Sequence, residues 1–365
     1  MLGSLPKNSV SRGTLAAHFV ALVTCVLIGC LNEPSAGPQP AASSPPPSVA
    51  LRVLVVNEPG LVEAIDRLKG EWAERTGGTL TAVSQPWEEI AKSQAIGADL
   101  IVFPTRYLGE LATRGWLRPV RQKVLEGNSY DAGDVLPLAR RELVTWGGQV
   151  MALPLCVDFP IAGLLFEAAP SVASDDRLDL LFDSKTMKPR ISEGPFVAAL
   201  TRLPSSGRPN GVRCPPVLGR GDHIVAVTSA TRNAASAFKL LEWLASAEIS
   251  TQLASAFEGS LPVRRSLGSS PAWYGTNVSA DERIKRGRLL EQALSCDRYL
   301  LVPRLPGVDE YLAVLDDAVD DFRYGDAEPQ VTLDEVAAKW EAITDRLGRD
   351  KQRAAYLKHL NIIEP

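Results

Sequence analysis

Short apolar runs alternate with amphipathic helical patterns in the first part of the chain. The runs Leu51–Val56 and Leu100–Phe103 are continuous and apolar, and Thr79–Ser84 is rich in strand-forming residues, so each predicts a strand. Leu61–Thr76 repeats apolar residues on one helical face and is followed by two glycines, which predicts a helix that ends there. Strands that alternate with helices are typical of an open parallel sheet. The pattern therefore predicts an α/β lobe.

Polar residues follow two of these strands directly. Thr105 and Arg106 come after the apolar run Leu100–Phe103 and one proline, and a short helical pattern follows them. Asn57 and Glu58 stand directly after the first strand. In an open parallel sheet, ligands bind outside the carboxyl ends of the strands, so these four side chains are candidate ligand-binding residues. Turn formation explains Asn57 equally well.

Strand and helix patterns continue to about Trp273, and beyond it the chain is predicted to be helical. A helical pattern near Val135–Leu143 is followed by two β-rich runs joined by Gly147 and Gly148, as a hairpin requires. Further strands are expected at Ile161–Phe166 and His223–Val227, and further helices at Phe196–Leu203, at Asn233–Phe257 as a pair, and at Asp281–Cys296, Gly307–Arg323 and Thr332–Gly348.

The N-terminal residues have the layout of an export signal. Two basic residues precede an apolar run from Leu15 to Ile28, which is too short to predict a membrane span. The run ends in Leu-Ile-Gly-Cys at Cys30, which resembles a bacterial lipobox. The resemblance implies that residues 1–29 are a lipoprotein signal peptide and that Cys30 receives a diacylglycerol. The alternatives are an uncleaved anchor or an ordinary signal peptide.

Composition separates a tether from a folded body. Residues 30–50 are dense in Pro, Ser and Ala and cannot bury enough apolar surface to fold, so they predict a semi-extended tether. The chain of 365 residues exceeds what one compact core normally holds, so we expect two lobes. The formal net charge of −4, without a basic block interleaved with aromatic residues, argues against nucleic acid as a partner.

Metal, cofactor and enzyme chemistry have no support in the sequence. Cys156, Cys214 and Cys296 lie in no metal-ligand spacing; one disulfide or three buried thiols would fit, and we expect the thiols. His-Glu-x-x-His and Gly-x-Ser-x-Gly motifs are absent. The Ser-x-x-Lys at Ser236 falls on an amphipathic helix without its partner motifs. We therefore expect no catalytic residue, no metal and no cofactor, and the protein is expected not to be an enzyme.

Three segments resemble one protein family. Gly148–Phe166, GQVMALPLCVDFPIAGLLF, is similar to the segment of family 1 extracellular solute-binding proteins that leaves the first lobe and crosses the hinge. Asn233–Phe257 resembles the two-helix signature of that family, and Gly259–Arg265 resembles its return crossing. These proteins are the receptors of ABC importers in the maltodextrin- and glycerol-phosphate-binding group. The resemblance implies a two-lobed, type II periplasmic-binding-protein-like fold.

The resemblance also implies a division into lobes. Lobe 1 would comprise 51–157 and about 259–365, including the C-terminal helices, and lobe 2 would comprise 158–258. The segment between Asp158 and the strand at His223 is shorter than in the family, so a reduced second lobe is expected.

The function implied is transport. The protein would be a lipid-anchored receptor on the periplasmic side of the cell envelope. It would bind a small polar ligand, a sugar or polyol, by hinge closure and deliver it to an ABC permease. The alternative is an envelope lipoprotein without a transport role that keeps the fold as an interaction module; a hydrolase is the weakest candidate.

Further candidate ligand-binding residues follow from this implied function. Trp87, Trp273 and Tyr274 are loop aromatics beside polar residues and could stack on a sugar ring. Asp158 at the hinge and Arg264 at the return crossing could satisfy hydroxyl groups. Core packing explains the aromatic residues as well, turn formation explains Asp158, and a solvated surface position explains Arg264.

Overall fold

The computed structural model describes residues 48–158, 165, 168, 181–203, 216–257 and 259–362, which belong to the unit Ser48–Pro365. The signal peptide, the acylated Cys30 and nearly all of the tether lie outside the described residues and stay predictions. None of the described helices combines the length and the apolar character that crossing a bilayer requires.

The largest sheet among the described residues has six strands in the order β2-β1-β3-β8-β6-β9. β1 pairs in parallel with β2 and β3, whereas β8 is antiparallel to both β3 and β6. The carboxyl ends of β1, β3 and β6 therefore lie at the same sheet edge as the first residue of β8. The strands span Ala50–Val56 (β1), Thr79–Gln85 (β2), Leu100–Pro104 (β3), Leu153–Val157 (β6), His223–Val227 (β8) and Leu261–Pro262 (β9).

Helices cover this sheet much as the periodicity predicts. The expected helix Leu61–Thr76 is two helices instead, because the Leu68 N–H bonds to the Ile65 carbonyl in a tighter turn. The second of them ends at Gly77 in the left-handed conformation. The bounds are Pro59–Arg67 (α1), Lys69–Thr76 (α2), Trp87–Lys92 (α3), Thr105–Tyr107 (η1), Leu108–Thr113 (α4), Gln122–Leu125 (α5), Pro137–Arg141 (α6), Ala234–Leu244 (α9), Ala247–Leu253 (α10), Ala254–Ala256 (η2), Arg265–Leu267 (η3), Pro271–Tyr274 (α11) and Ala280–Leu294 (α12). The hairpin is Thr145–Trp146 (β4) and Gln149–Val150 (β5).

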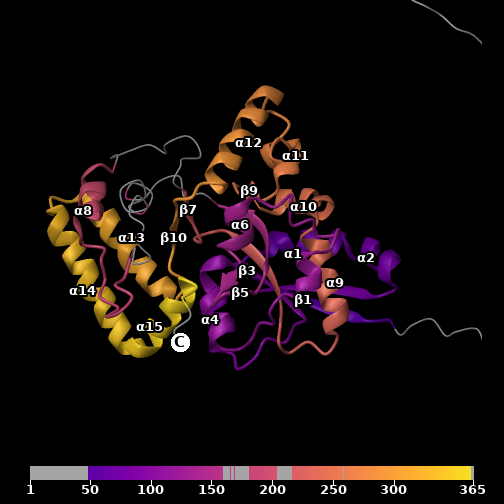
Figure 1. Cartoon of the computed structure of the whole chain (residues 1–365), viewed down its shortest axis with the longest axis horizontal. Helices are drawn as coiled ribbons and strands as arrows, with labels where there is room; N and C mark the ends of the chain where they lie inside the picture. Colours follow the sequence, from indigo (N-terminus) through magenta and orange to yellow (C-terminus); the bar gives the residue numbers. More distant parts are fainter. Residues whose placement is uncertain are drawn as a thin grey trace, which may run out of the picture. The chain divides into compact units, whose positions relative to one another are not determined.

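The C-terminal helices pack around a cluster of aromatic rings. Phe182 contacts the rings of Tyr311, Trp340 and Tyr356. Helices α13 and α14 lie side by side, and α14 also contacts α8 (Figure 1). The bounds are Gly194–Thr201 (α8), Val217–Leu218 (β7), Leu300–Leu301 (β10), Val308–Tyr324 (α13), Pro329–Leu347 (α14) and Arg349–His359 (α15). Helix α15, which was not predicted from the sequence, starts directly after Gly348 and contacts α4.

A buried arginine ties these helices to the sheet body. Arg304 is fully buried and donates hydrogen bonds to His359 Nδ1 (3.1 Å) and to the Glu142 carbonyl (2.8 Å). Its own carbonyl lies so close to α4 that a Cβ at Gly109 would stand 1.6 Å from it. Only glycine fits at that crossing, which explains a glycine inside a helix.

Two expectations from the sequence are wrong in part, and a third is untested. The strand expected at Ile161–Phe166 lies largely outside the described residues, and at Leu165 it is wrong because that residue is helical. The expectation of free thiols is wrong for Cys296, which is disulfide-bonded, while Cys156 is a buried free thiol. The division into lobes stays a prediction. However, β8 and α9, which it placed in lobe 2, lie in and on the sheet that contains β1.

Candidate functional site

Polar side chains from four strands converge at one edge of the sheet. Glu58 follows β1, Arg106 follows β3, Asp158 follows β6, and Asp222 and His223 stand at the start of β8. The antiparallel course of β8 brings its first residue to the carboxyl ends of its neighbours, and His223 pairs with Pro104 and with Cys156. This is the position where open sheets bind ligands.

A pocket of about 430 Å³ lies at this edge. We call it the sheet-edge pocket. Its lining combines acidic, basic and hydroxyl side chains with one aromatic ring, and comprises Glu58, Gly60, Glu63, Arg67, His223, Ser255, Ala256, Phe257 and Ser260. Glu58 is the only lining residue that the sequence analysis named as a ligand-binding candidate.

His223 presents an unsatisfied nitrogen to this pocket. The side chain is 9% exposed, and its Nε2 has no hydrogen-bond partner among the described residues, although Glu58 Oε1 lies 3.8 Å away. Burial, together with the nearby charge of Arg106, lowers the pKa of His223 to about 4. Burial also raises the pKa of Glu58. The imidazole is therefore neutral at pH 7, and a ligand can supply its missing partner.

Phe257 is the aromatic ring of the sheet-edge pocket. Its ring centroid lies 5.4 Å from that of His223. The Trp273 ring lies parallel to Phe257, with centroids 6.2 Å apart and an interplanar angle of 3°. Trp273 is 9% exposed, and neither it nor Tyr274 lines the pocket. The structure thus places Phe257 where the sequence analysis expected Trp273 and Tyr274, and puts Trp273 against it.

Asp222 holds the loops at this edge together. The side chain is fully buried and accepts hydrogen bonds from the backbone N–H groups of Asp158 (2.6 Å) and Gly219. Its backbone carbonyl accepts from the Thr105 N–H (2.7 Å). Burial raises the pKa of Asp222 to about 7 and also raises that of Asp158. Asp158 and Thr105 are therefore at the predicted edge, although neither lines the pocket.

Arg106 makes three hydrogen bonds to protein groups. It donates to Asp309 Oδ1 (2.9 Å), to the Arg220 carbonyl (2.6 Å) and to the Tyr107 hydroxyl (2.9 Å). Tyr107 donates in turn to Asp309 Oδ2 (2.7 Å). The predicted ligand-binding arginine thus connects the sheet edge to the first turn of α13, and it does not line the sheet-edge pocket.

Asn57 and Trp87 form a local structure beside the edge. Asn57 has a φ of 59°, and its side-chain carbonyl accepts the Trp87 backbone N–H (3.0 Å), which is a turn role. The Trp87 ring stacks on Tyr107, with centroids 3.9 Å apart. Neither residue lines the sheet-edge pocket; Trp87 lines a separate groove instead.

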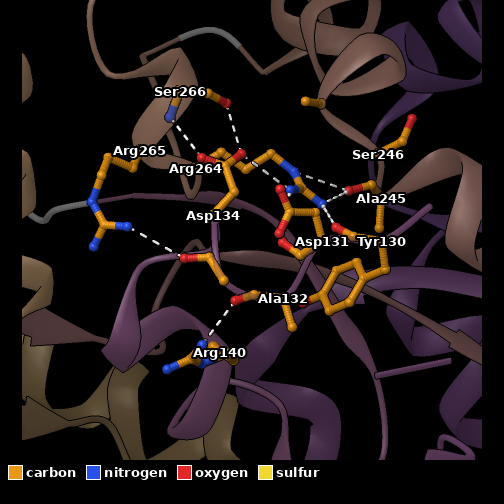
Figure 2. A network of polar contacts seen from close by, with 12 residues as sticks. Tyr130, Asp131, Ala132, Asp134, Arg140, Ala245, Ser246, Arg264, Arg265 and Ser266 are labelled. Carbon is orange, nitrogen blue, oxygen red and sulfur yellow. Dashed lines mark hydrogen bonds and ion pairs between the residues drawn. The ribbon is translucent and has the colours of Figure 1, made fainter. Parts of the chain in front are cut away.

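Arg264 belongs to a buried structural network (Figure 2). It is 1% exposed and donates to the carbonyls of Tyr130 (2.6 Å) and Ala245 (3.1 Å) and to the Asp134 carboxylate (3.2 Å). Although burial alone would raise the pKa of Asp134, hydrogen bonds from Ser266 and the Arg264 guanidinium lower it. The network lines neither pocket. A ligand-binding role for Arg264 has no support in this geometry.

The described residues contain no group of three or more His, Cys, Asp or Glu side chains placed to hold a metal ion. Cys156 is fully buried, with Sγ 3.8 Å from His223 Nδ1, and burial raises the pKa of its thiol. The thiol therefore stays protonated and out of reach of solvent, unlike a catalytic cysteine.

Searches by sequence find neither a matching family model nor a matching curated protein. Solved structures do match. The sugar-binding protein MalE from Xanthomonas citri superposes with a TM-score of 0.62 at 13% identity, over 83% of this chain and 100% of that one. A cyclo/maltodextrin-binding protein in complex with maltotetraose gives 0.56 at 16% identity, over 82% and 98%. A ribitol-bound ABC transporter solute-binding protein from Agrobacterium radiobacter K84 gives 0.54 at 15%, over 81% and 98%. The predicted fold class is thus confirmed: the chain has the periplasmic-binding-protein-like fold.

Proposed function

We propose that the protein is an extracytoplasmic solute-binding protein of an ABC importer that binds a sugar or polyol in the sheet-edge pocket. The observation that carries the proposal is this pocket, located at the carboxyl ends of the parallel strands. The fold is shared with proteins whose structures hold maltotetraose, ribitol or D-mannitol, which supports the choice of ligand class.

The pocket chemistry suits a polyhydroxylated ligand. The Phe257 ring can stack on the apolar face of a sugar. Glu58 and Glu63 can accept hydrogen bonds from hydroxyl groups, and Arg67 can donate them. A volume of about 430 Å³ lies toward the lower end of the range for ligand pockets. We therefore propose a monosaccharide or a short polyol rather than a long oligosaccharide.

The proposed mechanism is closure around the ligand. A ligand that contacts both sides of the sheet edge stabilises the closed form by its additional contacts, and the permease would recognise that form. Lipidation at Cys30 and a tether over 30–50 would hold the body at the membrane on the periplasmic side. The disulfide at Cys296 supports an oxidising compartment. Because the Cys156 thiol is buried and protonated, the Cys156–His223 contact does not support an enzyme.

One observation favours the second candidate, an interaction module without a transport role. Arg106 already has protein partners for three donors, so the contact between the sheet edge and α13 forms without a ligand. A scaffold would need such a ligand-independent contact.

A thermal-shift screen separates these two functions. A binder gains stability as ligand concentration rises, so a panel of monosaccharides and polyols should raise the melting temperature in the transport case. Calorimetry should then give an affinity that Phe257→Ala and Glu58→Gln each weaken by about tenfold. Arg265→Ala is the matched control, because this exposed side chain pairs with Glu291 away from the pocket. Absence of any stabilising sugar or polyol would favour the scaffold.

A further inference from the structure

A second, larger concave site lies apart from the sheet-edge pocket. It has a volume of about 900 Å³ and shares no lining residue with that pocket. We call it the Trp87 groove. One wall comes from α3 and α4, the other comes from α15, and residues 306–310 close one end. The Trp87 ring, stacked on Tyr107, belongs to the first wall.

The α15 wall presents a narrow stripe of small and basic residues. Lys351, Ala354, Ala355 and Lys358 all line the groove, and their spacing of three, one and three residues places them on one helical face. The two alanines leave room between the two lysines. The α15 wall is therefore an apolar surface with a cation at each end.

The acids of the groove are largely neutralised by partners in the protein. Glu110 pairs with Arg114. Asp309 pairs with Arg106 (2.9 Å), and Glu310 pairs with Arg346. Glu88 has no such partner among the described residues.

The lysines of the groove, by contrast, have no acidic partner. Within the described part of the chain, no ion pair joins Lys92, Lys351 or Lys358 to a carboxylate. Three unpaired cations against one unpaired acid, Glu88, give the groove a net positive character. It therefore favours an anion over a neutral or cationic molecule.

Gln352 adds an independent sign that the groove has an occupant. The side chain is 2% exposed and lines the groove, and its Nε2 donates to the Pro306 carbonyl (3.1 Å). Its Oε1 is buried without a donor among the described residues. Buried acceptors are almost always satisfied, so a molecule that reaches the floor of the groove would supply the missing donor.

We propose that the Trp87 groove is a second binding site, for a small carboxylate that has an apolar body and one hydrogen-bond donor. The carboxylate would lie between Lys351 and Lys358, the apolar body against Trp87 and the alanines, and the donor toward Gln352 Oε1. A phosphate dianion fits less well, because the unpaired Glu88 lines the same groove and would repel its second charge. This proposal does not depend on the function proposed for the sheet-edge pocket.

Phenyllactate is a suitable probe, because it combines an aromatic body, a hydroxyl group and one carboxylate. Calorimetry with the full chain should give a dissociation constant in the millimolar range or below, weakened by added salt. Phenyllactamide, which lacks the charge, and phenylpropionate, which lacks the hydroxyl, should each bind more weakly. Failure of phenyllactate to bind at millimolar concentration would overturn the proposal.

Variants locate the binding site. Replacing both α15 lysines (Lys351→Met and Lys358→Met) should weaken phenyllactate binding about tenfold, because two exposed charge contacts are lost while the apolar stems remain. The matched control replaces Lys339 and Lys285, exposed lysines of α14 and α12 that do not line the groove. If the control variant lost as much affinity for phenyllactate, or if Phe257→Ala lost it instead, the placement of the binding site in the Trp87 groove would be contradicted. Sugar affinity, measured separately, should not change in the α15 variant.

Discussion

Replacing Arg264 by alanine should lower the stability of the fold without acting through a ligand. The substitution removes the donor from two buried backbone carbonyls, those of Tyr130 and Ala245, and from the Asp134 carboxylate. Each buried acceptor left without a partner lowers the free energy of unfolding by about 1–3 kcal/mol. Removing one partner of a buried ion pair lowers it by about 3–5 kcal/mol. The contributions overlap, so we expect a loss of about 3–5 kcal/mol in the free energy of unfolding.

Urea unfolding followed by circular dichroism measures this loss as a shift of the midpoint at constant slope. Arg265→Ala is the matched control, because the neighbouring side chain is half exposed and pairs with Glu291 at the surface. Its expected effect is below about 1 kcal/mol. If Arg264→Ala lowered stability no more than Arg265→Ala, or weakened sugar binding while leaving stability unchanged, the structural role assigned to this network would be refuted.

Two further predictions concern packing and pH. Gly109→Ala should cost at least about 1–3 kcal/mol, because the new Cβ would stand 1.6 Å from the Arg304 carbonyl. Gly97→Ala is the control, because its new Cβ would have no atom within 4 Å, so its effect on stability should be nearly zero. Equal melting temperatures for the two variants would count against the close approach of the Arg304 carbonyl to Gly109. Because burial raises the pKa of Asp222 from 3.8 to about 7, the folded state binds more protons than the unfolded state between these values. The Asp222 contribution to stability should therefore fall as pH rises through this window. Urea unfolding at several pH values should show that the free energy of unfolding of Asp222→Asn depends less on pH in this window than that of the unchanged protein. An equal dependence on pH in the two proteins would contradict the assignment.

The strands and the edge of the sheet could be predicted because their signals are local. Leu100–Phe103 is a continuous apolar run followed by polar residues, and this predicted both a buried strand and the sheet edge where Arg106 lies. The same reasoning placed Glu58, which lines the sheet-edge pocket.

The rest of the site depends on pairings between residues distant in the sequence. His223 reaches the edge only because β8 inserts antiparallel between β3 and β6. Phe257 looks like one more apolar residue of a helical repeat, and no local signal separates it from the core. Arg264 was expected at a ligand, but its partners Tyr130 and Ala245 belong to segments whose proximity the sequence does not reveal.

The most direct test of the sheet-edge pocket is an NMR titration that follows the ring signals of the histidines. His223 lines the pocket, whereas His359 is buried against Arg304 and serves as an internal control. We predict that the sugar or polyol that stabilises the protein will shift the His223 signals and leave those of His359 unchanged. A ligand that raises the melting temperature but leaves the His223 ring signals unchanged would contradict binding in the sheet-edge pocket.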